Sequence, residues 1–341
     1  MRFQRVCVEA VSHVLPDEVV TSAELEARLA PLYERLRLPA GRLELMSGIR
    51  ERRFFPPGTR PGDVSIRTAE AAVAASGLSR EAFGACLHGS VCRDCLEPAT
   101  ACRVHHALGL SGDCVVQDLS NACLGVLSGM LQIATMIELG QIDAGVVVGT
   151  EDGRSLVENT VAKLNADESL SRGEIKDSFA SLTIGSASAA VVLCHERLSR
   201  AGHRLHAASV HAETRHHELC RSEGLTQVMR TDSERLMRAG VDAGVVNFDK
   251  LLAASGWDRA RIDRSFCHQV GGTHRRSMLE ALGLPVDRDF ATFERLGNTG
   301  AAALPCAWSM GVEASEVNAG DRLALLGIGS GVNCLMMAVD W

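Results

Sequence analysis

The clearest hydrophobic pattern lies in the first half of the chain, where two short apolar segments flank a longer one. Residues 113–119 (DCVVQDL) and 143–149 (DAGVVVG) have the length and composition of buried strands. Residues 123–139 (CLGVLSGMLQIATMIEL) are apolar on nearly every side and end at Gly140. A helix that is hydrophobic all round belongs inside a large protein. The three segments therefore predict a strand–helix–strand unit built on a buried helix.

A similar unit is predicted near the C-terminus. Residues 290–296 are expected to form a strand, the small residues from 301 to about 317 a helix that Gly320 closes, and residues 323–329 (LALLGIG) a buried strand. Two such units predict a duplicated α/β body. Because strand–helix–strand units are common, this pattern alone leaves open that their likeness is coincidental.

The boundary between the two halves is expected where a polar stretch, residues 164–178, gives way to the strand-like residues 181–194 (SLTIGSASAAVVLC). We therefore divide the chain into residues 1–180 and 181–341. Within the first half, residues 55–64 (FPPGTRPGDV) predict a surface loop, residues 68–75 a helix, and residues 85–91 a strand that leads into a loop.

Composition supports this picture. Hydrophobic residues make up 46% of the chain and aromatic residues only 4%, so the core must consist of Ala, Val, Leu and Ile. Such a core suits strands that helices cover on both faces. A formal charge of −7 argues against nucleic acid as a main partner. The N-terminus lacks the pattern of a signal peptide, and no run of about 18 apolar residues predicts a membrane span. With 12 cysteines, we expect a soluble cytoplasmic protein with reduced thiols.

Three polar residues occupy equivalent places in this scheme. Cys123 stands where a loop becomes the buried helix, His268 follows the predicted strand 264–267, and Asn298 precedes the second small-residue helix. N–H groups at a helix N-terminus favour a thiolate and can stabilise an oxyanion. Taken singly, each has a plainer explanation: a core cysteine, a satisfied histidine and a turn. Together they indicate an active site, because ligands collect at the carboxyl ends of strands in such folds.

The segments around these residues carry a resemblance to a known family. They are DLSNACLGVLSGM (118–130), CHQVG (267–271) and LGNTGAAALP (296–305), with supporting matches in SGIRERR (47–53), LTIGSASAAVVL (182–193) and GIGSGVNC (327–334). In these motifs the chain resembles the β-ketoacyl synthase III branch of the thiolase superfamily. The resemblance implies a duplicated, five-layered αβαβα thiolase fold whose two related halves surround buried central helices.

The resemblance also implies roles for the site residues. Cys123 would be the acylated nucleophile, and His268 and Asn298 would donate hydrogen bonds to the carbonyl oxygen of a second thioester. The backbone N–H groups of Cys123 and Ser330 would form the oxyanion hole of the acyl-enzyme.

The loop at residues 90–101 (SVCRDCLEPATA) resembles that of OleA-type enzymes, which join two fatty acyl-CoAs without decarboxylation. The resemblance implies a 2-alkyl-3-oxoacyl product and a homodimer in which Glu97, 26 positions before Cys123, reaches the partner subunit's site as a base. Removal of a weakly acidic α-proton demands such a base. Without the resemblance, Glu97 is better explained as an exposed loop charge or a residue at a helix N-terminus.

Several features leave alternatives open. A decarboxylating 3-oxoacyl-acyl-carrier-protein synthase that uses malonyl-carrier protein is the alternative function; a non-catalytic subunit is disfavoured because Cys123 is present. We expect acyl-CoA as a substrate, possible use of acyl-carrier protein, and no permanently bound cofactor. Residues 36–47 lack the tryptophan that commonly packs on adenine in the family, so only Arg50, Arg52 and Arg53 are candidates for the CoA phosphates.

Two clusters compete with this interpretation. Cys92 and Cys95 have CxxC spacing, and Cys102, His105 and His106 follow, but a second suitable pair is missing, so we predict no metal site. A group of histidines is expected in a polar cap or loop without an assigned role: His203, His206, His211, His216 and His217.

Overall fold

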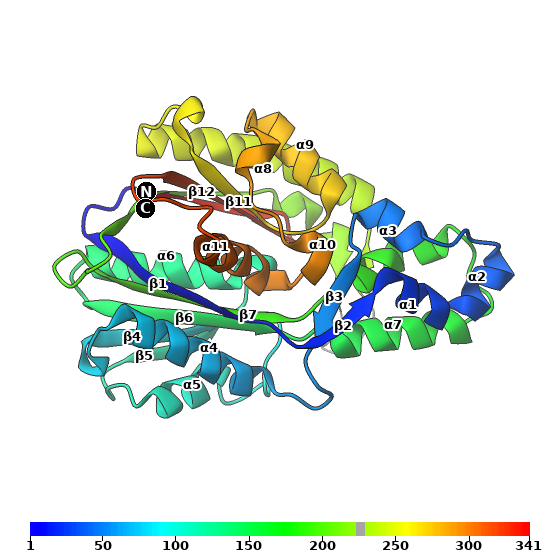
Figure 1. Cartoon of the computed structure of the whole chain (residues 1–341), viewed down its shortest axis with the longest axis horizontal. Coiled ribbons are helices and arrows are strands. Elements are labelled where there is room, and N and C mark those ends of the chain that lie inside the picture. Colours follow the sequence, from blue (N-terminus) through cyan, green and yellow to red (C-terminus); the bar gives the residue numbers. More distant parts are fainter. Residues whose placement is uncertain (223–228) are drawn as a thin grey trace.

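The computed structural model describes residues 1–222 and 229–341, and in this part of the chain a nine-stranded mixed sheet forms the centre of the molecule (Figure 1). Its strand order is β11-β12-β13-β8-β1-β7-β6-β4-β5. The strands are β1 (Val6–Val14), β4 (Phe83–Gly89), β5 (Val115–Leu119), β6 (Ala144–Glu151), β7 (Ala187–His195), β8 (His203–Ala212), β11 (Arg264–Cys267), β12 (Arg322–Gly329) and β13 (Asn333–Asp340). Two small pairs join β2 (Glu18–Thr21) to β3 (Glu51–Phe54) and β9 (Cys220–Arg221) to β10 (Arg230–Thr231).

Helices connect and cover these strands. The α-helices are α1 (Ser22–Arg28), α2 (Ala30–Leu36), α3 (Arg42–Ser47), α4 (Pro61–Ser76), α5 (Thr100–Leu108), α6 (Gly125–Glu138), α7 (Arg154–Ala166), α8 (Ser233–Ser255), α9 (Gly272–Leu282), α10 (Phe293–Leu296) and α11 (Ala303–Glu313). Short 3₁₀ turns are η1 (Arg80–Ala82), η2 (Ala122–Leu124), η3 (Glu174–Thr183), η4 (Thr214–Leu219), η5 (Arg259–Arg261), η6 (Val286–Arg288) and η7 (Gly300–Ala302).

The strand pairings repeat. In the N-terminal half β4 pairs parallel with β6, β6 antiparallel with β7, and β7 antiparallel with β1. In the C-terminal half β11, β12, β13 and β8 pair with the same directions in the same order. Within the sheet, the two halves are joined where Cys7 and Val8 of β1 pair with Arg204 and His203 of β8. This repeat confirms the predicted duplicated α/β fold.

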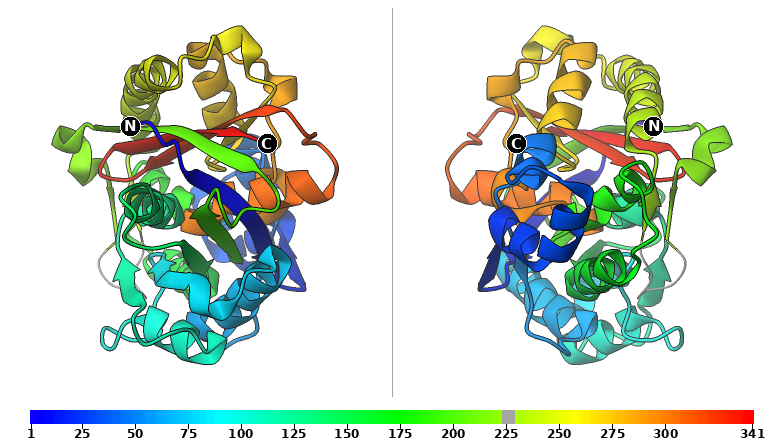
Figure 2. Two further views of the ribbon diagram at one scale, coloured as in Figure 1. Left: turned by 90° about the vertical axis from the view of Figure 1, so that its left-hand side faces the viewer. Right: turned by 90° about the vertical axis from the view of Figure 1, so that its right-hand side faces the viewer.

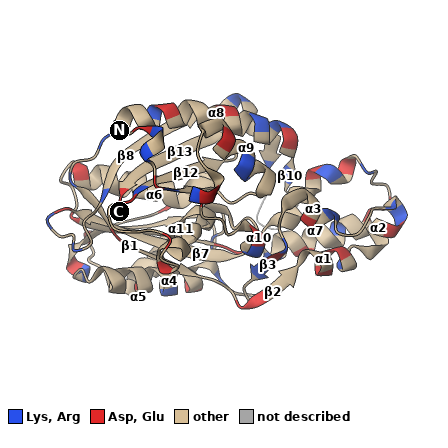
Figure 3. Cartoon of the chain, turned by 45° about the horizontal axis from the view of Figure 1, so that its top comes forward, with Lys and Arg blue, Asp and Glu red and all other residues tan. Residues whose placement is uncertain are grey.

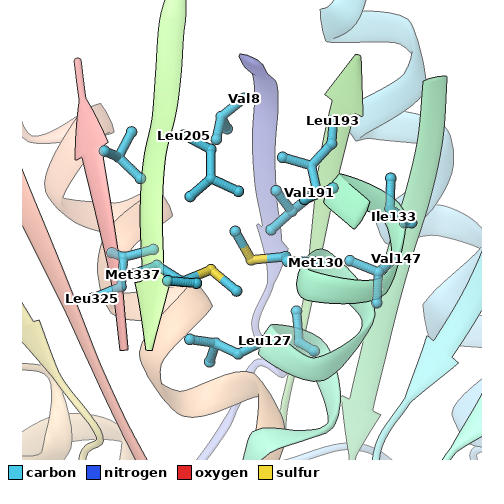
Figure 4. Close-up of a cluster of buried hydrophobic side chains, with 14 of the residues drawn as sticks. Val8, Leu127, Met130, Ile133, Val147, Val191, Leu193, Leu205, Leu325 and Met337 are labelled. Carbon is cyan, nitrogen blue, oxygen red and sulfur yellow. The ribbon is translucent and has the colours of Figure 1, made fainter. Parts of the chain in front are cut away.

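Five layers follow from where the helices lie. Helices α6 and α11 lie between the two halves of the sheet, α4 and α5 cover the outer face of one half, and α8 and α9 cover the other (Figures 1 and 2). Figure 4 shows Met130 of α6 between Val191 of the first half and Met337 of the second. Trp308 of α11 is fully buried in the same cluster. The central layer is therefore apolar, as the all-round hydrophobic pattern of residues 123–139 predicted.

The outer helices carry the charge. Acidic and basic residues intermingle along α8 and α9 (Figure 3), with Arg238 paired to Glu234 on α8. Within residues 1–222 and 229–341, no helix combines the length and the apolar character that a membrane crossing requires.

Some predicted boundaries differ from the structure. The loop at residues 55–64 ends early because α4 begins at Pro61, and proline suits the first turn of a helix. The predicted strand at residues 290–296 is wrong: an isolated bridge joins Ser265 to Asp289, and α10 follows. The C-terminal central helix ends at Glu313 rather than near residue 317. The division at residue 180 stays a prediction, although β7 pairs with the N-terminal strands β1 and β6.

Candidate active site

Cys123 lies in the 3₁₀ turn η2, between the end of β5 and the first residue of α6. The turn is tight: Ala122 has φ 44°, and the N–H of Leu124 donates to the carbonyl of Asn121 at 2.9 Å. Gly125 then lets the helix approach the end of β4, because a Cβ there would lie 2.5 Å from the carbonyl oxygen of Gly89. The chain thus holds the thiol at the N-terminal end of the central helix. The α-helix itself begins at Gly125, two residues later than the sequence predicted, and Cys123 lies in the 3₁₀ turn before it.

The thiol of Cys123 is protonated in the unliganded enzyme. Burial raises the pKa of Cys123 to about 12, and the nearby Glu151 carboxylate and Cys220 thiol add to the rise. A helix N-terminus stabilises an anion by at most about 2 kcal/mol, or about 1.5 pKa units, which does not offset this shift. Burial therefore opposes the thiolate that the helix N-terminus favours, and Cys123 loses its proton as it attacks.

The turn after β12 lies against the backbone of Cys123. A Cβ on Gly329 would come within 3.5 Å of the Cys123 nitrogen, so the segment leading into Ser330 approaches the expected oxyanion hole. The Cys220 thiol accepts from the Thr231 hydroxyl at 3.5 Å, and the Ser330 hydroxyl also lies against it. Ser330 and Cys123 therefore lie close together, with Cys220 near both.

His268 follows β11 directly, as the sequence predicted, and is 4% exposed. Its backbone N–H donates to the carbonyl of Leu326 on β12 at 3.1 Å. Burial and the neighbouring His274 lower the pKa of His268 to about 3, so the imidazole is neutral. Among the described residues, none forms a hydrogen bond with its Nδ1 atom. A neutral imidazole can donate one hydrogen bond to a developing oxyanion.

Asn298 lies between α10 and η7, where its backbone is held from both sides. Its N–H donates to Thr183 at 2.9 Å, and its carbonyl accepts from Gly185 at 3.0 Å. The side-chain Oδ1 accepts from the N–H of Gly300 at 3.0 Å, which orients the amide so that Nδ2 is its free donor end. Gly297 is required before it, because its φ is 67° and a Cβ would lie 2.5 Å from the Thr183 oxygen.

Buried polar side chains connect these loops. Gln269, next to His268, accepts from the N–H groups of Thr292 and Phe293 at 2.9 and 3.3 Å, so it orders the chain that leads to Asn298. The turns η2 and η7, which precede the two central helices, contact each other. The three predicted residues therefore belong to one connected site at the start of α6 and α11.

Glu97 lies apart from this site within its own chain. It is exposed at the tip of the loop between β4 and α5, beside Leu96, which is 89% exposed. In the part of the chain that the structure describes, its carboxylate forms no ion pair. A subunit by itself thus leaves Glu97 free to reach a second molecule.

The three arginines that were candidates for CoA phosphates differ in exposure. Arg52 is 1% exposed, and its guanidinium donates to Val20, Ser22 and Leu182 at 3.1–3.4 Å. Its assignment to a phosphate is wrong, because the guanidinium is buried and both of its Nη atoms donate to these buried acceptors. Arg53 donates to the Pro16 carbonyl at 3.1 Å, whereas Arg50 is exposed and pairs with Glu294 at 3.3 Å.

Sequence analysis missed Glu151 and Cys220, which both lie close enough to Cys123 to affect its ionisation. Glu151 is the last residue of β6 and is 5% exposed. A carboxylate two residues beyond an apolar predicted strand was the available signal, but that predicted strand ended at Gly149. Cys220 carries no comparable signal in the sequence.

The competing clusters have local partners. The Cys92 sulfur lies against the backbone of Asp152, and Cys95 contacts the Pro98 carbonyl. Within the described ranges, no group of three or more metal-ligating side chains forms. The expected histidine loop is partly strand: His203 and His206 lie on β8 and stack on Trp341 and Trp257.

A duplicated α/β fold with a cysteine before one central helix, and a histidine and an asparagine in loops beside it, defines a condensing enzyme of the thiolase superfamily. Residues 252–341 match the model of the 3-oxoacyl-[acyl-carrier-protein] synthase III C-terminal domain. At 41% identity, and covering 100% of both chains, this protein is similar to an acyl-CoA:acyl-CoA alkyltransferase of Shewanella oneidensis. It is 32% identical to the enzyme of that name from Xanthomonas campestris, again over 100% of both.

The chain belongs to the family of acyl-CoA:acyl-CoA alkyltransferases, the OleA family. A crystal structure of X. campestris OleA superposes with a TM-score of 0.95 at 32% identity, covering 100% of both chains. Another structure of that protein, with a TM-score of 0.95, has bound lauric acid and lauroyl-CoA. Similarity to a β-ketoacyl-[acyl-carrier-protein] synthase III of Cereibacter sphaeroides is lower, at 26% identity over 99% of each chain.

Proposed function

We propose that this enzyme joins two fatty acyl-CoA molecules by Claisen condensation without decarboxylation. Cys123 takes the first acyl group, and the enolate of the second acyl-CoA attacks it to give a 2-alkyl-3-oxoacyl thioester. The observation that carries the proposal is the position of Glu97, a carboxylate on an exposed loop tip with no partner in the described part of its own chain. A decarboxylating synthase has no need for such a base, since loss of CO₂ makes its carbanion.

In the first half-reaction the Cys123 sulfur attacks the acyl-CoA carbonyl. The thiol proton is transferred to the departing CoA sulfur as the C–S bond to CoA breaks, and His268 stays neutral. The N–H groups of Cys123 and Ser330 stabilise the oxyanion. No resident cofactor takes part, because every step uses side-chain or backbone groups.

In the second half-reaction Glu97 of the partner subunit removes an α-proton from the second acyl-CoA. His268 and Asn298 donate hydrogen bonds to the enolate oxygen, and the enolate carbon attacks the acyl-Cys123 carbonyl. The C–S bond to Cys123 breaks, and the proton held by the carboxyl returns to the sulfur. Neutral His268 suits this step because it donates without trapping the enolate as a tight ion pair.

Two observations support a homodimer, and a third supports Glu97 as the residue that its sites share. Strand β5 is an edge strand with Val115 37% exposed, and unpaired edges invite pairing with a second chain. Leu96, beside Glu97, exposes an apolar side chain that a partner would bury. In X. campestris OleA, solved with a glutamate or a cysteine replaced, that glutamate precedes that cysteine by as many positions as Glu97 precedes Cys123.

The setting is proposed to be the cytoplasm, where CoA thioesters are made. All 12 cysteines are unpaired, as expected in a reducing compartment. Arg50 is the exposed cation left to contact a CoA phosphate, and acyl-carrier protein is an alternative carrier of the acyl group.

The test supplies the purified enzyme with labelled acyl-CoA alone, or with acyl-CoA and malonyl-carrier protein. We expect condensed product from acyl-CoA alone, and a protein mass increase of one acyl group that is absent in Cys123→Ala. Release of CO₂ from malonyl-carrier protein, with no product from acyl-CoA alone, would establish the decarboxylating reaction instead.

A further inference from the structure

Glu151 is a buried carboxylate that the reaction above does not use. Its Oε1 accepts the N–H groups of Val91 at 3.0 Å and Ala301 at 3.2 Å, and its Oε2 accepts that of Cys92 at 3.2 Å. Within residues 1–222 and 229–341 it forms no ion pair, so these backbone donors and the Cys92 thiol offset part of the cost of its burial, which still raises the pKa of Glu151. Three donors shared by two oxygens require a carboxylate, since a glutamine would turn its NH₂ group toward at least one of them.

These three donors belong to two functional loops. Val91 and Cys92 begin the loop that carries Glu97, and Ala301 lies in η7, three residues after Asn298. The contact is close, because a Cβ on Gly300 would lie 2.9 Å from the Glu151 Cγ. One side chain therefore ties the root of the Glu97 loop to the turn that holds the enolate-binding amide.

Beyond Val91 and Cys92, the loop that carries Glu97 has few further anchors. Asp94 anchors the middle by accepting from Gly62 at 2.7 Å and pairing with Arg103, but its tip at Glu97 is exposed. A small rotation at Val91 and Cys92 thus displaces the tip. Misplacement of a catalytic group by about 1 Å can cost about 100-fold in rate.

Glu151 does not serve to activate the nucleophile. Its negative charge contributes to the raised pKa of Cys123, which disfavours the thiolate. Its contribution must therefore lie in what it holds in place.

We propose that Glu151 is a positioning residue that couples the two active sites of the dimer, by fixing the loop that delivers Glu97 to the partner subunit together with the Asn298 turn of its own site. This inference rests on the proposed function, in which Glu97 acts across the interface.

The test uses mixed dimers with one competent site, purified through two different tags. One chain carries Cys123→Ala and provides Glu97; the other carries Glu97→Ala and provides Cys123. Adding Glu151→Gln to the Cys123→Ala chain alters only the loop that is delivered to the competent site. We expect condensation to fall at least about tenfold, while acylation of Cys123 in the other chain keeps its rate.

Glu9→Gln in the same chain is the matched control. Glu9 is also buried, at 8% exposed, and accepts from Ser199, Arg200 and Ala201. It lies at the opposite end of the sheet, because it contacts Cys194, which pairs with the first residue of β6. We expect no change in condensation from this variant beyond that caused by any loss of stability.

The outcomes separate the two levels of the account. An inactive parent mixed dimer overturns the cross-subunit role of Glu97, and this inference with it. If the parent mixed dimer is active, Glu151→Gln and Glu9→Gln in the Cys123→Ala chain are compared. Equal loss of condensation in the two variants overturns this inference alone. If Glu151→Gln does not assemble, Glu151→Asp, which keeps the charge and shortens the reach, is read by the same two outcomes.

Discussion

Asn298 offers a sharp test of how the two half-reactions divide the site. Its Oδ1 accepts from Gly300 at 3.0 Å, so Nδ2 is the donor left for the enolate. Asn298→Asp keeps the acceptor and removes the donor, whereas Asn298→Ala removes both. The pair of variants therefore distinguishes loss of the catalytic hydrogen bond from loss of the local fold.

The structure sets the expected magnitudes. Removal of one donor to an oxyanion lowers kcat by about 10²–10³. Loss of the bond to Gly300 costs about 0.5–1.5 kcal/mol of stability. Both variants should thus lose condensation by at least about 100-fold, with Asn298→Asp the worse because its carboxylate meets the enolate charge. Only Asn298→Ala should be measurably less stable.

The assay follows the two steps separately. Intact mass after rapid mixing with a long-chain acyl-CoA gives the rate of Cys123 acylation, and extraction of the 2-alkyl-3-oxo product gives condensation. We expect acylation within about threefold of wild type in both variants, since Nδ2 of Asn298 is assigned to the second thioester and not to the first. Condensation by Asn298→Asp at the wild-type rate, or a loss of acylation equal to the loss of condensation, would refute the assigned role.

Three further predictions concern Arg52, Arg50 and His268. Arg52→Met should lower the free energy of unfolding by about 3 kcal/mol, because it leaves buried acceptors without donors, and should leave the KM for acyl-CoA unchanged. Arg50→Ala should change the free energy of unfolding by less than about 1 kcal/mol and raise the KM for acyl-CoA. Denaturant melts and initial rates check both, and the reverse pattern would return Arg52 to the CoA site. For His268, the unfolded imidazole binds a proton below its ordinary pKa of 6.5, whereas the folded one stays neutral to about 3. The neutral imidazole therefore costs no free energy of unfolding above pH 6.5, but lowers it as the pH falls. Between about pH 6 and 4, the free energy of unfolding of the wild type should fall by about 1.4 kcal/mol per pH unit more than that of His268→Asn. Parallel pH profiles of the two proteins would show that His268 is not held neutral.

The elements that could be predicted are those in which local pattern and tertiary position agree. The central helix α6 is apolar on every face because both halves of the sheet pack on it, so its sequence carries the signal directly. Strand β11 and the site residue that follows it, His268, were placed correctly for the same reason. The predicted strand at residues 290–296 was wrong, because Gln269 accepts the N–H groups of Thr292 and Phe293 and the chain forms a helical turn there.

Other features depend on contacts that no local pattern contains. Arg52 reads as a surface cation, yet its position on β3 beside β2 buries it against carbonyls from two distant segments. The protonated state of Cys123 follows from burial and from Glu151, which is remote from it in sequence. The proposed role of Glu97 requires a second subunit, and only the resemblance to OleA-type enzymes suggested it.

The most direct test of the account is complementation between Cys123→Ala and Glu97→Ala subunits. Each homodimer should be nearly inactive in condensing acyl-CoAs. Random exchange makes about half of the dimers mixed, each with one intact site, so activity should recover to about a quarter of the wild-type value. No recovery, with subunit exchange verified by tagged chains, would contradict the claim that Glu97 serves its partner's Cys123. Full activity of Glu97→Ala alone would contradict the claim that Glu97 is the base.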